Sequence, residues 1–179
     1  MLRKGYTAAS VRDVAAAAGA PQGSFTNHFR SKESFSGEVL ERYFEHVRAL
    51  VSRALDDQSL TPRGRLLRYL EIITGILEAD GFTRGCLIGD FSLEAAPLSE
   101  TIRRQLSDIF LEWRARFAAC IEEGQSTGEI DGTFHPDELA DFLLASWEGA
   151  ILRMKLERSA APLERFKTIA FATVFRECE

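Results

Sequence analysis

Apolar residues recur at intervals of three and four along nearly the whole chain, and the strict alternation typical of β-strands is hard to find. Such spacing places the apolar side chains on one face of a helix, where they can be buried together. The pattern therefore predicts an all-α fold. The expected helices cover residues 10–18, 22–29, 31–55, 61–81, 86–95, 102–121, 136–154 and 162–175.

Capping signals support several of these boundaries. Ser10 and Asp13 have the spacing of a capping box, and Gly19 can adopt the left-handed conformation that ends a short helix. Thr61 followed by Pro62 is typical of a helix start, because proline fits the first helical position. A turn is expected within residues 124–132, which contain three glycines.

Charge is distributed unevenly along the 179 residues, although the net charge is only −5. Residues 1–32 carry a net +4, so the remainder of the chain carries −9. A small basic module on a larger acidic body suits contact with phosphates at one end only. No apolar run approaches the roughly 20 residues of a membrane span. The absence of a signal sequence and the wide spacing of Cys86, Cys120 and Cys178 favour a cytoplasmic protein.

The sequence gives little support for a catalytic or cofactor-binding motif. Residues 124–128 spell GxSxG, but a nucleophile elbow needs a strand before its serine, and here a helical pattern precedes it. The sequence contains no HExxH, Walker or GxGxxG motif and no clustered Cys/His set. We therefore expect neither an enzyme, a metal site nor a cofactor.

Residues 10–29 have the pattern of a helix-turn-helix. Ala15 lets two helices cross closely, Gly19 begins the turn, and Phe25 is the expected buried residue of the second helix. That helix offers short polar side chains able to reach base edges in a major groove. A helix pair of this kind is also common as plain packing in α-proteins. The polar residues are Gln22, Ser24, Thr26, Asn27 and His28.

The surrounding sequence, KGYTAASVRDVAAAAGAPQGSFTNHFRSKESF from Lys4 to Phe35, resembles the DNA-binding signature of the tetracycline-repressor (TetR) family almost position by position. This resemblance implies a homodimer that binds operator DNA through the helix-turn-helix and releases it when a small molecule binds. It also implies that Ser10 and Lys32 hold phosphates while the second helix reads the groove. The implied DNA-binding residues are Ser10, Gln22, Gly23, Ser24, Thr26, Asn27, His28 and Lys32.

Two departures from the family pattern affect these expectations. Thr26 stands where the family usually has tyrosine, which shortens the reach of that side chain. The family also has a complete helix before the Gly5-Tyr6 pair, whereas only residues 1–4 precede it here. We expect that a first helix lies upstream, because the apolar face of the module needs a cover. A helical ligand-binding module that has lost DNA binding is the alternative.

The predicted domains are residues 1–48, for DNA, and residues 49–179, for the effector and the dimer. Bulky residues of the larger domain suit an apolar effector. Candidate effector residues are Cys86, Trp113, Phe117, Phe142 and Trp147. Candidate dimer residues are Phe142, Trp147, Ile151, Phe166, Ala170, Phe171 and Val174.

Two questions about this larger domain stay open at the level of sequence. Phe171 and Phe175 lie well round the last helix from Phe166 and Ala170, so they face either a second subunit or another part of the same core. The segment RGCLIGDFSLEAA, from residue 84, resembles a subgroup in which a cysteine beside the effector pocket responds to electrophiles or oxidants. Cys86 is accordingly either a reactive thiol or a small buried hydrophobe.

Overall fold

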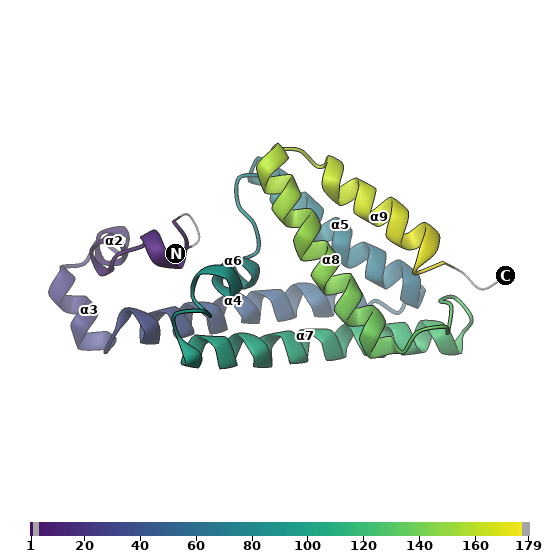
Figure 1. The fold of residues 1–179 in the computed structure, drawn as a ribbon, viewed down its shortest axis with the longest axis horizontal. Coiled ribbons are helices and arrows are strands. Elements are labelled where there is room, and N and C mark those ends of the chain that lie inside the picture. The colour runs from purple at the N-terminus through teal and green to yellow at the C-terminus, as the bar shows by residue number, and fades with distance from the viewer. Residues whose placement is uncertain (2–3, 177–179) are drawn as a thin grey trace. The chain divides into compact units, whose positions relative to one another are not determined.

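A computed structural model describes residues 1 and 4–176. Within these residues the chain forms nine helices and no strand, which confirms the all-α prediction. The helices are α1 (Gly5–Ala8), α2 (Val11–Ala17), α3 (Gln22–His28), α4 (Lys32–Leu55), α5 (Pro62–Ala79), α6 (Leu87–Glu94), α7 (Glu100–Ser126), α8 (Pro136–Glu157) and α9 (Ala161–Thr173) (Figure 1).

The contacts divide the chain into two compact units. The first unit comprises Met1–His46 and Cys86–Ile109, and the second comprises Val47–Gly85 and Phe110–Glu179. The first stretch ends close to the domain boundary expected at residue 48. Residues 86–109, which the sequence pattern assigns to the larger domain, group with the N-terminal helices because α6 packs against α1.

Local capping accounts for the short helices of the first unit. The Ser10 hydroxyl accepts a hydrogen bond from the Asp13 N–H (3.1 Å), and the Asp13 carboxylate accepts one from the Ser10 N–H (2.9 Å), which completes the predicted capping box. Gly19 ends α2 with a φ of +63°, and the Ala20 N–H donates back to the Ala15 carbonyl (3.0 Å). Sequence analysis anticipated both ends of α2 for these reasons.

Aromatic side chains fill the core of the first unit. The ring of Phe25 lies 5.3 Å from that of Phe29 and 5.5 Å from that of Phe35, measured between centroids. Phe29 and Phe35 meet edge to face at 4.9 Å. Such pairs contribute roughly 0.5–1.5 kcal/mol each beyond their burial. The cluster fixes α3 against the start of α4, as the predicted burial of Phe25 requires.

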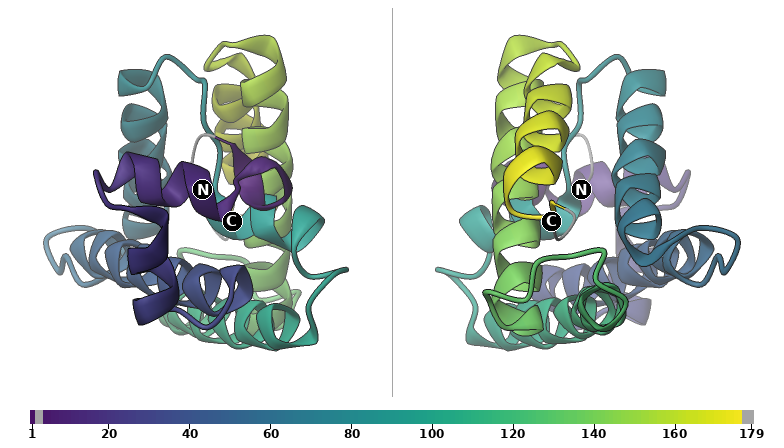
Figure 2. Two further views of the ribbon diagram at one scale, coloured as in Figure 1. Left: turned by 90° about the vertical axis from the view of Figure 1, so that its left-hand side faces the viewer. Right: turned by 90° about the vertical axis from the view of Figure 1, so that its right-hand side faces the viewer.

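The second unit contains α5, α8, α9 and parts of α4 and α7. Thr61 caps α5 by accepting a hydrogen bond from the Gly64 N–H (3.2 Å), as predicted. Helices α8 and α9 run antiparallel and side by side (Figures 1 and 2). Trp147 of α8 packs on Phe166 of α9, with their ring centroids 5.5 Å apart. These contacts make α8 and α9 one layer of the unit.

Phe171 and Phe175 are covered within the chain itself, with 6% and 0% of their surface exposed. Their rings lie 5.5 Å apart, and the guanidinium of Arg63 lies 5.3 Å from the centroid of Phe171. Of the two alternatives open from sequence, burial in the same core therefore accounts for this pair.

Arg63 also terminates α9. Its Nε donates to the carbonyl of Phe175 (2.8 Å) and its Nη2 to that of Phe171 (2.9 Å). The last carbonyls of a helix lack partners within the helix and carry the negative end of its dipole, so a cation is favourable there. Arg63 thus ties the start of α5 to the end of α9.

We predict that Arg63→Ala lowers the free energy of unfolding by about 1–3 kcal/mol, because two partly buried carbonyls lose a charged donor. Arg68→Ala is the matched control. It lies on the same helix, and its 3.7 Å ion pair with Glu71 is half exposed, so its loss should change stability by less than about 0.5 kcal/mol. Denaturant unfolding at one protein concentration measures both. Equal effects of the two variants would contradict the assigned role of Arg63.

Candidate DNA-binding site and apolar groove

Helices α2 and α3 form the helix-turn-helix that the sequence predicts. They pack against each other through Ala15, which is 5% exposed, and Phe25, which is 7% exposed. The small side chain of Ala15 permits the close crossing. The other face of α3 is polar: Ser24 is half-buried, and the remaining candidate residues of the helix are exposed. The exposed residues are Gln22, Gly23, Thr26, Asn27 and His28.

One of these exposed side chains, that of Thr26, already forms a hydrogen bond within α3. The hydroxyl of Thr26 donates to the carbonyl of Gly23 (2.8 Å), one turn earlier in α3. This bond directs the donor hydrogen back to the helix and leaves the oxygen lone pairs and the methyl group for an external contact. Asn27 and His28 therefore offer the longer reach from this helix.

The N-terminal residues of the module form a small charged network. The hydroxyl of Ser10 donates to the Asp13 carboxylate (2.7 Å), and Lys4 Nζ donates to the same carboxylate (2.7 Å). The Lys4 ammonium, followed by the N–H and hydroxyl of Ser10, holds the pKa of the Asp13 carboxyl well below its ordinary value. Asp13 is therefore ionised at neutral pH, where it caps α2 and offsets one of the positive charges of this module.

Lys32, the other candidate for phosphate contact, lies against α1. Its Nζ donates to the carbonyl of Thr7 (3.3 Å) and lies 4.6 Å from the centroid of the Tyr6 ring. These two contacts fix the position of Lys32, the first residue of α4, relative to α1.

A contact between α1 and α6 completes the first unit. Tyr6 meets Phe91 edge to face, with centroids 5.6 Å apart. The carboxylate of Glu94 accepts a hydrogen bond from the N–H of Thr7 (2.9 Å). Gly5, at a φ of +73°, has this carboxylate directly beside its α-carbon. Sequence reasoning missed this contact because its partners are 87 residues apart and neither side matches a motif.

Cys86 begins the same helix. It is the N-cap residue of α6 and is 9% exposed. Its burial is what the packing interpretation predicts, and its position at a helix N-terminus is what the reactive-thiol interpretation predicts. Its proposed reactivity stays a prediction. Cys120 is buried in the second unit, where burial raises the pKa of its thiol to about 11, and Cys178 lies outside the described residues.

The other candidate effector residues belong to the second unit, and the structure separates one of them from the rest. Trp113, Phe117 and Trp147 are buried, with exposed fractions of 3%, 0% and 1%. Phe142 is 44% exposed and lies on the surface of α8 that faces α9. The three buried residues therefore remain candidates for an interior site, whereas Phe142 belongs to a surface feature.

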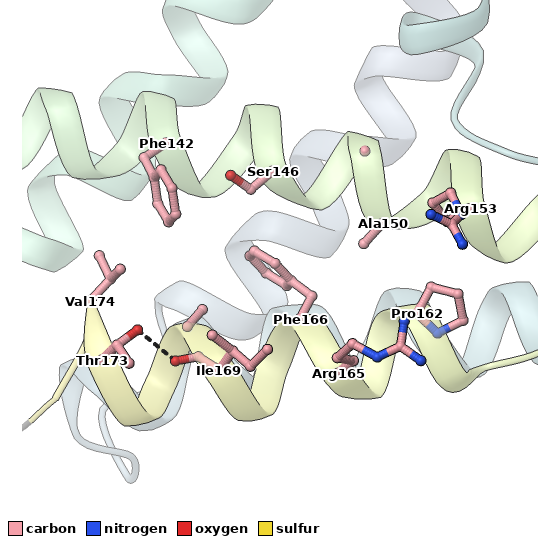
Figure 3. Close-up of a pocket in the computed structure, with 12 residues that line it drawn as sticks. Phe142, Ser146, Ala150, Arg153, Pro162, Arg165, Phe166, Ile169, Thr173 and Val174 are labelled. Atoms are coloured by element: carbon pink, nitrogen blue, oxygen red, sulfur yellow. Dashed lines mark hydrogen bonds between the residues drawn. The ribbon is translucent and has the colours of Figure 1, made fainter.

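This feature is an apolar groove of about 310 Å³ between α8 and α9 (Figure 3). Phe142, Phe166, Ala170 and Val174, four of the predicted dimer residues, line it. The other three dimer candidates do not: Trp147, Ile151 and Phe171 are buried inside the chain.

Sequence analysis also overlooked Ile169, which lines the same groove. This side chain is 56% exposed in the structure. Its position next to Ala170 in an apolar run made it look like an ordinary core residue.

Comparison with known proteins agrees with this architecture. Residues 1–39 match the family model described as bacterial regulatory proteins, tetR family, and residues 62–170 match the one described as tetracyclin repressor-like, C-terminal domain. The fold and the site thus define a helix-turn-helix regulator with a helical C-terminal body. The chain belongs to the TetR family of bacterial transcriptional regulators.

Several curated relatives align along most of their length. The HTH-type transcriptional repressor DhaR of Mycobacterium sp. (strain GP1) is 47% identical over 99% of this chain and 88% of its own. The transcriptional regulator AcuR of Cereibacter sphaeroides is 36% identical over 93% and 76%, respectively. The repressor NemR of Escherichia coli is 30% identical over 91% and 82%. All three relatives are named as transcriptional regulators or repressors.

Solved structures show the same fold. A TetR regulatory protein from Rhodobacter sphaeroides superposes with a TM-score of 0.89 at 35% identity, covering 94% of this chain and 89% of that one. The reduced form of E. coli NemR gives 0.86 at 27% identity, covering 99% and 93%. Within residues 1 and 4–176, no helix is long and apolar enough to cross a membrane.

We predict that Glu94→Ala accelerates hydrogen exchange at the Thr7 amide by about tenfold, because that N–H loses a charged acceptor. Leu93→Ala is the control on the same helix, since Leu93 is 70% exposed, and it should leave the exchange rate unchanged. Amide exchange followed by NMR measures both variants. An unchanged rate in Glu94→Ala would show that α1 is held by other contacts.

Proposed function

We propose that the protein is a repressor that binds operator DNA as a homodimer through α3 and releases it when a small molecule binds the C-terminal body. The observation that carries this proposal is the helix-turn-helix of α2 and α3, which exposes five candidate residues of α3 next to a buried Phe25. TetR-family repressors bind DNA, act as dimers and respond to small molecules. This proposal places the protein in the cytoplasm, beside its operator.

Two kinds of DNA contact follow from the positions of the side chains. Asn27 and Gln22 are amides on the exposed face of α3, and amides form paired hydrogen bonds with adenine in the major groove. Lys32 lies outside α3 and suits phosphates, which fix the position of the protein without reading sequence. Ser10, also outside α3, would contact a phosphate by turning its hydroxyl hydrogen away from the Asp13 carboxylate. Base discrimination and general affinity are thus assigned to different residues.

The test compares one residue of each kind on the same operator fragment from the promoter region of the protein's own gene. We expect Asn27→Ala to weaken operator binding by about 1–3 kcal/mol and to reduce discrimination against a mutated operator. Lys32→Ala should weaken binding to both fragments alike and lower the slope of affinity against salt by about one. Gel-shift titrations at several salt concentrations measure these effects.

A further control is Arg42→Ala, which removes an exposed cation from α4 outside the helix-turn-helix and should leave discrimination intact. Failure of the unmodified chain to shift either fragment would instead support a helical ligand-binding module that has lost DNA binding. If Asn27→Ala distinguishes the operator from the mutated fragment as well as the unmodified chain does, Asn27 does not read a base.

The groove between α8 and α9 is the proposed dimer interface. Its apolar side chains include Phe142 and Ile169, which are about half exposed in the single chain. In Figure 3, Phe142 projects from α8 toward α9, and Phe166 lies between the two helices. A second copy would bury this surface in a symmetric four-helix contact, and two-fold symmetric dimers are the commonest homo-oligomers.

We expect Ile169→Asp to convert the dimer, of twice 20.0 kDa, into the 20.0 kDa monomer, because a charge in an apolar interface lacks a partner. Leu111→Asp is the matched control, since Leu111 of α7 is 51% exposed and lies outside the groove. Sedimentation equilibrium gives the mass of each variant. A dimeric Ile169→Asp protein would exclude the groove as the interface.

A further inference from the structure

The chain contains two tryptophans, and both are buried in the second unit. Trp113 of α7 is 3% exposed and Trp147 of α8 is 1% exposed. The two helices that carry them are joined by Arg114, which forms ion pairs with Asp137 (3.4 Å) and Asp141 (3.2 Å). Both indoles therefore lie in the interior of one compact unit.

Neither indole N–H has a hydrogen-bond acceptor among the described residues. A buried tryptophan usually finds such a partner, and an unpaired buried donor destabilises the fold. The Nε atoms of Arg65 and Arg114 in the same unit also lack a hydrogen-bond acceptor. Each of these guanidiniums nevertheless donates through another nitrogen, Arg65 Nη1 to the carbonyl of Leu55 (3.0 Å) and Arg114 Nη1 to the carboxylate of Asp141 (3.2 Å). An indole has a single polar hydrogen, so each tryptophan leaves its whole hydrogen-bonding capacity unused.

Packing explains the rings but not their N–H groups. Trp113 stacks on Phe110 with centroids 5.9 Å apart, and Trp147 packs on Phe166. A phenylalanine could supply an aromatic ring at either place without burying a polar hydrogen. The N–H is therefore the part of each side chain that the packing leaves unused.

We propose that Trp113 and Trp147 donate hydrogen bonds to the effector, and that the effector is an uncharged, largely apolar molecule with a carbonyl-type acceptor oxygen. This inference rests on the proposed function, in which a small molecule binds the C-terminal body. An indole N–H can only donate, so the group it recognises must be an acceptor. Phe117 and Leu143, which lie one helical turn from Trp113 and Trp147 on α7 and α8, are apolar and buried.

The charge of the ligand follows from the surroundings. Among the described residues of this unit, the buried charged residue is Arg65. Its guanidinium already forms an ion pair with the carboxylate of Glu123. A carboxylate ligand in the interior would need a cation of its own. A ketone, aldehyde, ester or amide needs only a hydrogen-bond donor, which each tryptophan supplies.

The test uses the full chain labelled with ¹⁵N-tryptophan, whose two indole cross-peaks report on the two donors separately. The probes are pairs of equal shape: acetophenone with α-methylstyrene, and cyclohexanone with methylenecyclohexane. In each pair a C=O replaces a C=CH₂. We expect the ketone to bind about tenfold more tightly than its hydrocarbon partner and to shift at least one indole cross-peak downfield.

Variants assign the preference to the N–H groups. Trp113→Phe or Trp147→Phe, at whichever indole shifts, should abolish the preference for the ketone and leave the binding of the hydrocarbon within about threefold. Phe117→Leu is the packing control, because it alters a neighbouring buried ring without removing a donor, and it should weaken both members of a pair alike. The titration needs no DNA, so its outcome is independent of operator binding.

Three results would overturn the proposal. One is equal affinity for the two members of each pair, and another is the absence of any indole shift with either ketone. The third is a water cross-relaxation signal at both indole protons that persists at saturating ketone, which would assign the two donors to internal water. Operator binding by the same sample, measured in a gel shift, would show in each case that only the assignment of the effector had failed.

Discussion

The hydrogen bond between the Thr7 N–H and the Glu94 carboxylate, with the Tyr6 ring on Phe91 beside it, holds together the part of the protein proposed to bind DNA. Helices α1, α2 and α3 contain only four, seven and seven residues. Isolated helices shorter than about 12 residues are marginal in water, so tertiary contacts must hold them in place. The contact from α6 fixes α1, and the carbonyl of Thr7 in turn holds Lys32 at the start of α4.

Dependence on distant contacts also decides which features of the structure could be predicted from the sequence. The ends of α2 and the start of α5 depend on neighbours in sequence, and the Ser10, Gly19 and Thr61 signals located them. The exposed polar face of α3 followed from a buried Phe25 and the helical period. The partner of α1 and the partners of Arg63 lie far away in sequence, where no local pattern indicates them.

Helix α9 shows a further limit of periodicity. Phe171 and Ile169 are both apolar residues of α9, yet the first is 6% exposed and the second 56%. Periodicity identifies an apolar face but does not say which neighbour covers it. Arg63 decides the matter for Phe171 by reaching its ring and its carbonyl from α5, a contact that the sequence pattern does not reveal.

The bond to Glu94 also imposes an order on the folding of a newly made chain. Thr7 leaves the ribosome 87 residues before its partner, and synthesis at about 5–20 residues per second separates the two by several seconds. During that interval α1 lacks its packing surface, and closing so long a loop opposes the contact entropically. Helix α1 is therefore fixed only after α6 has emerged, so a segment that is synthesised early reaches its final place late.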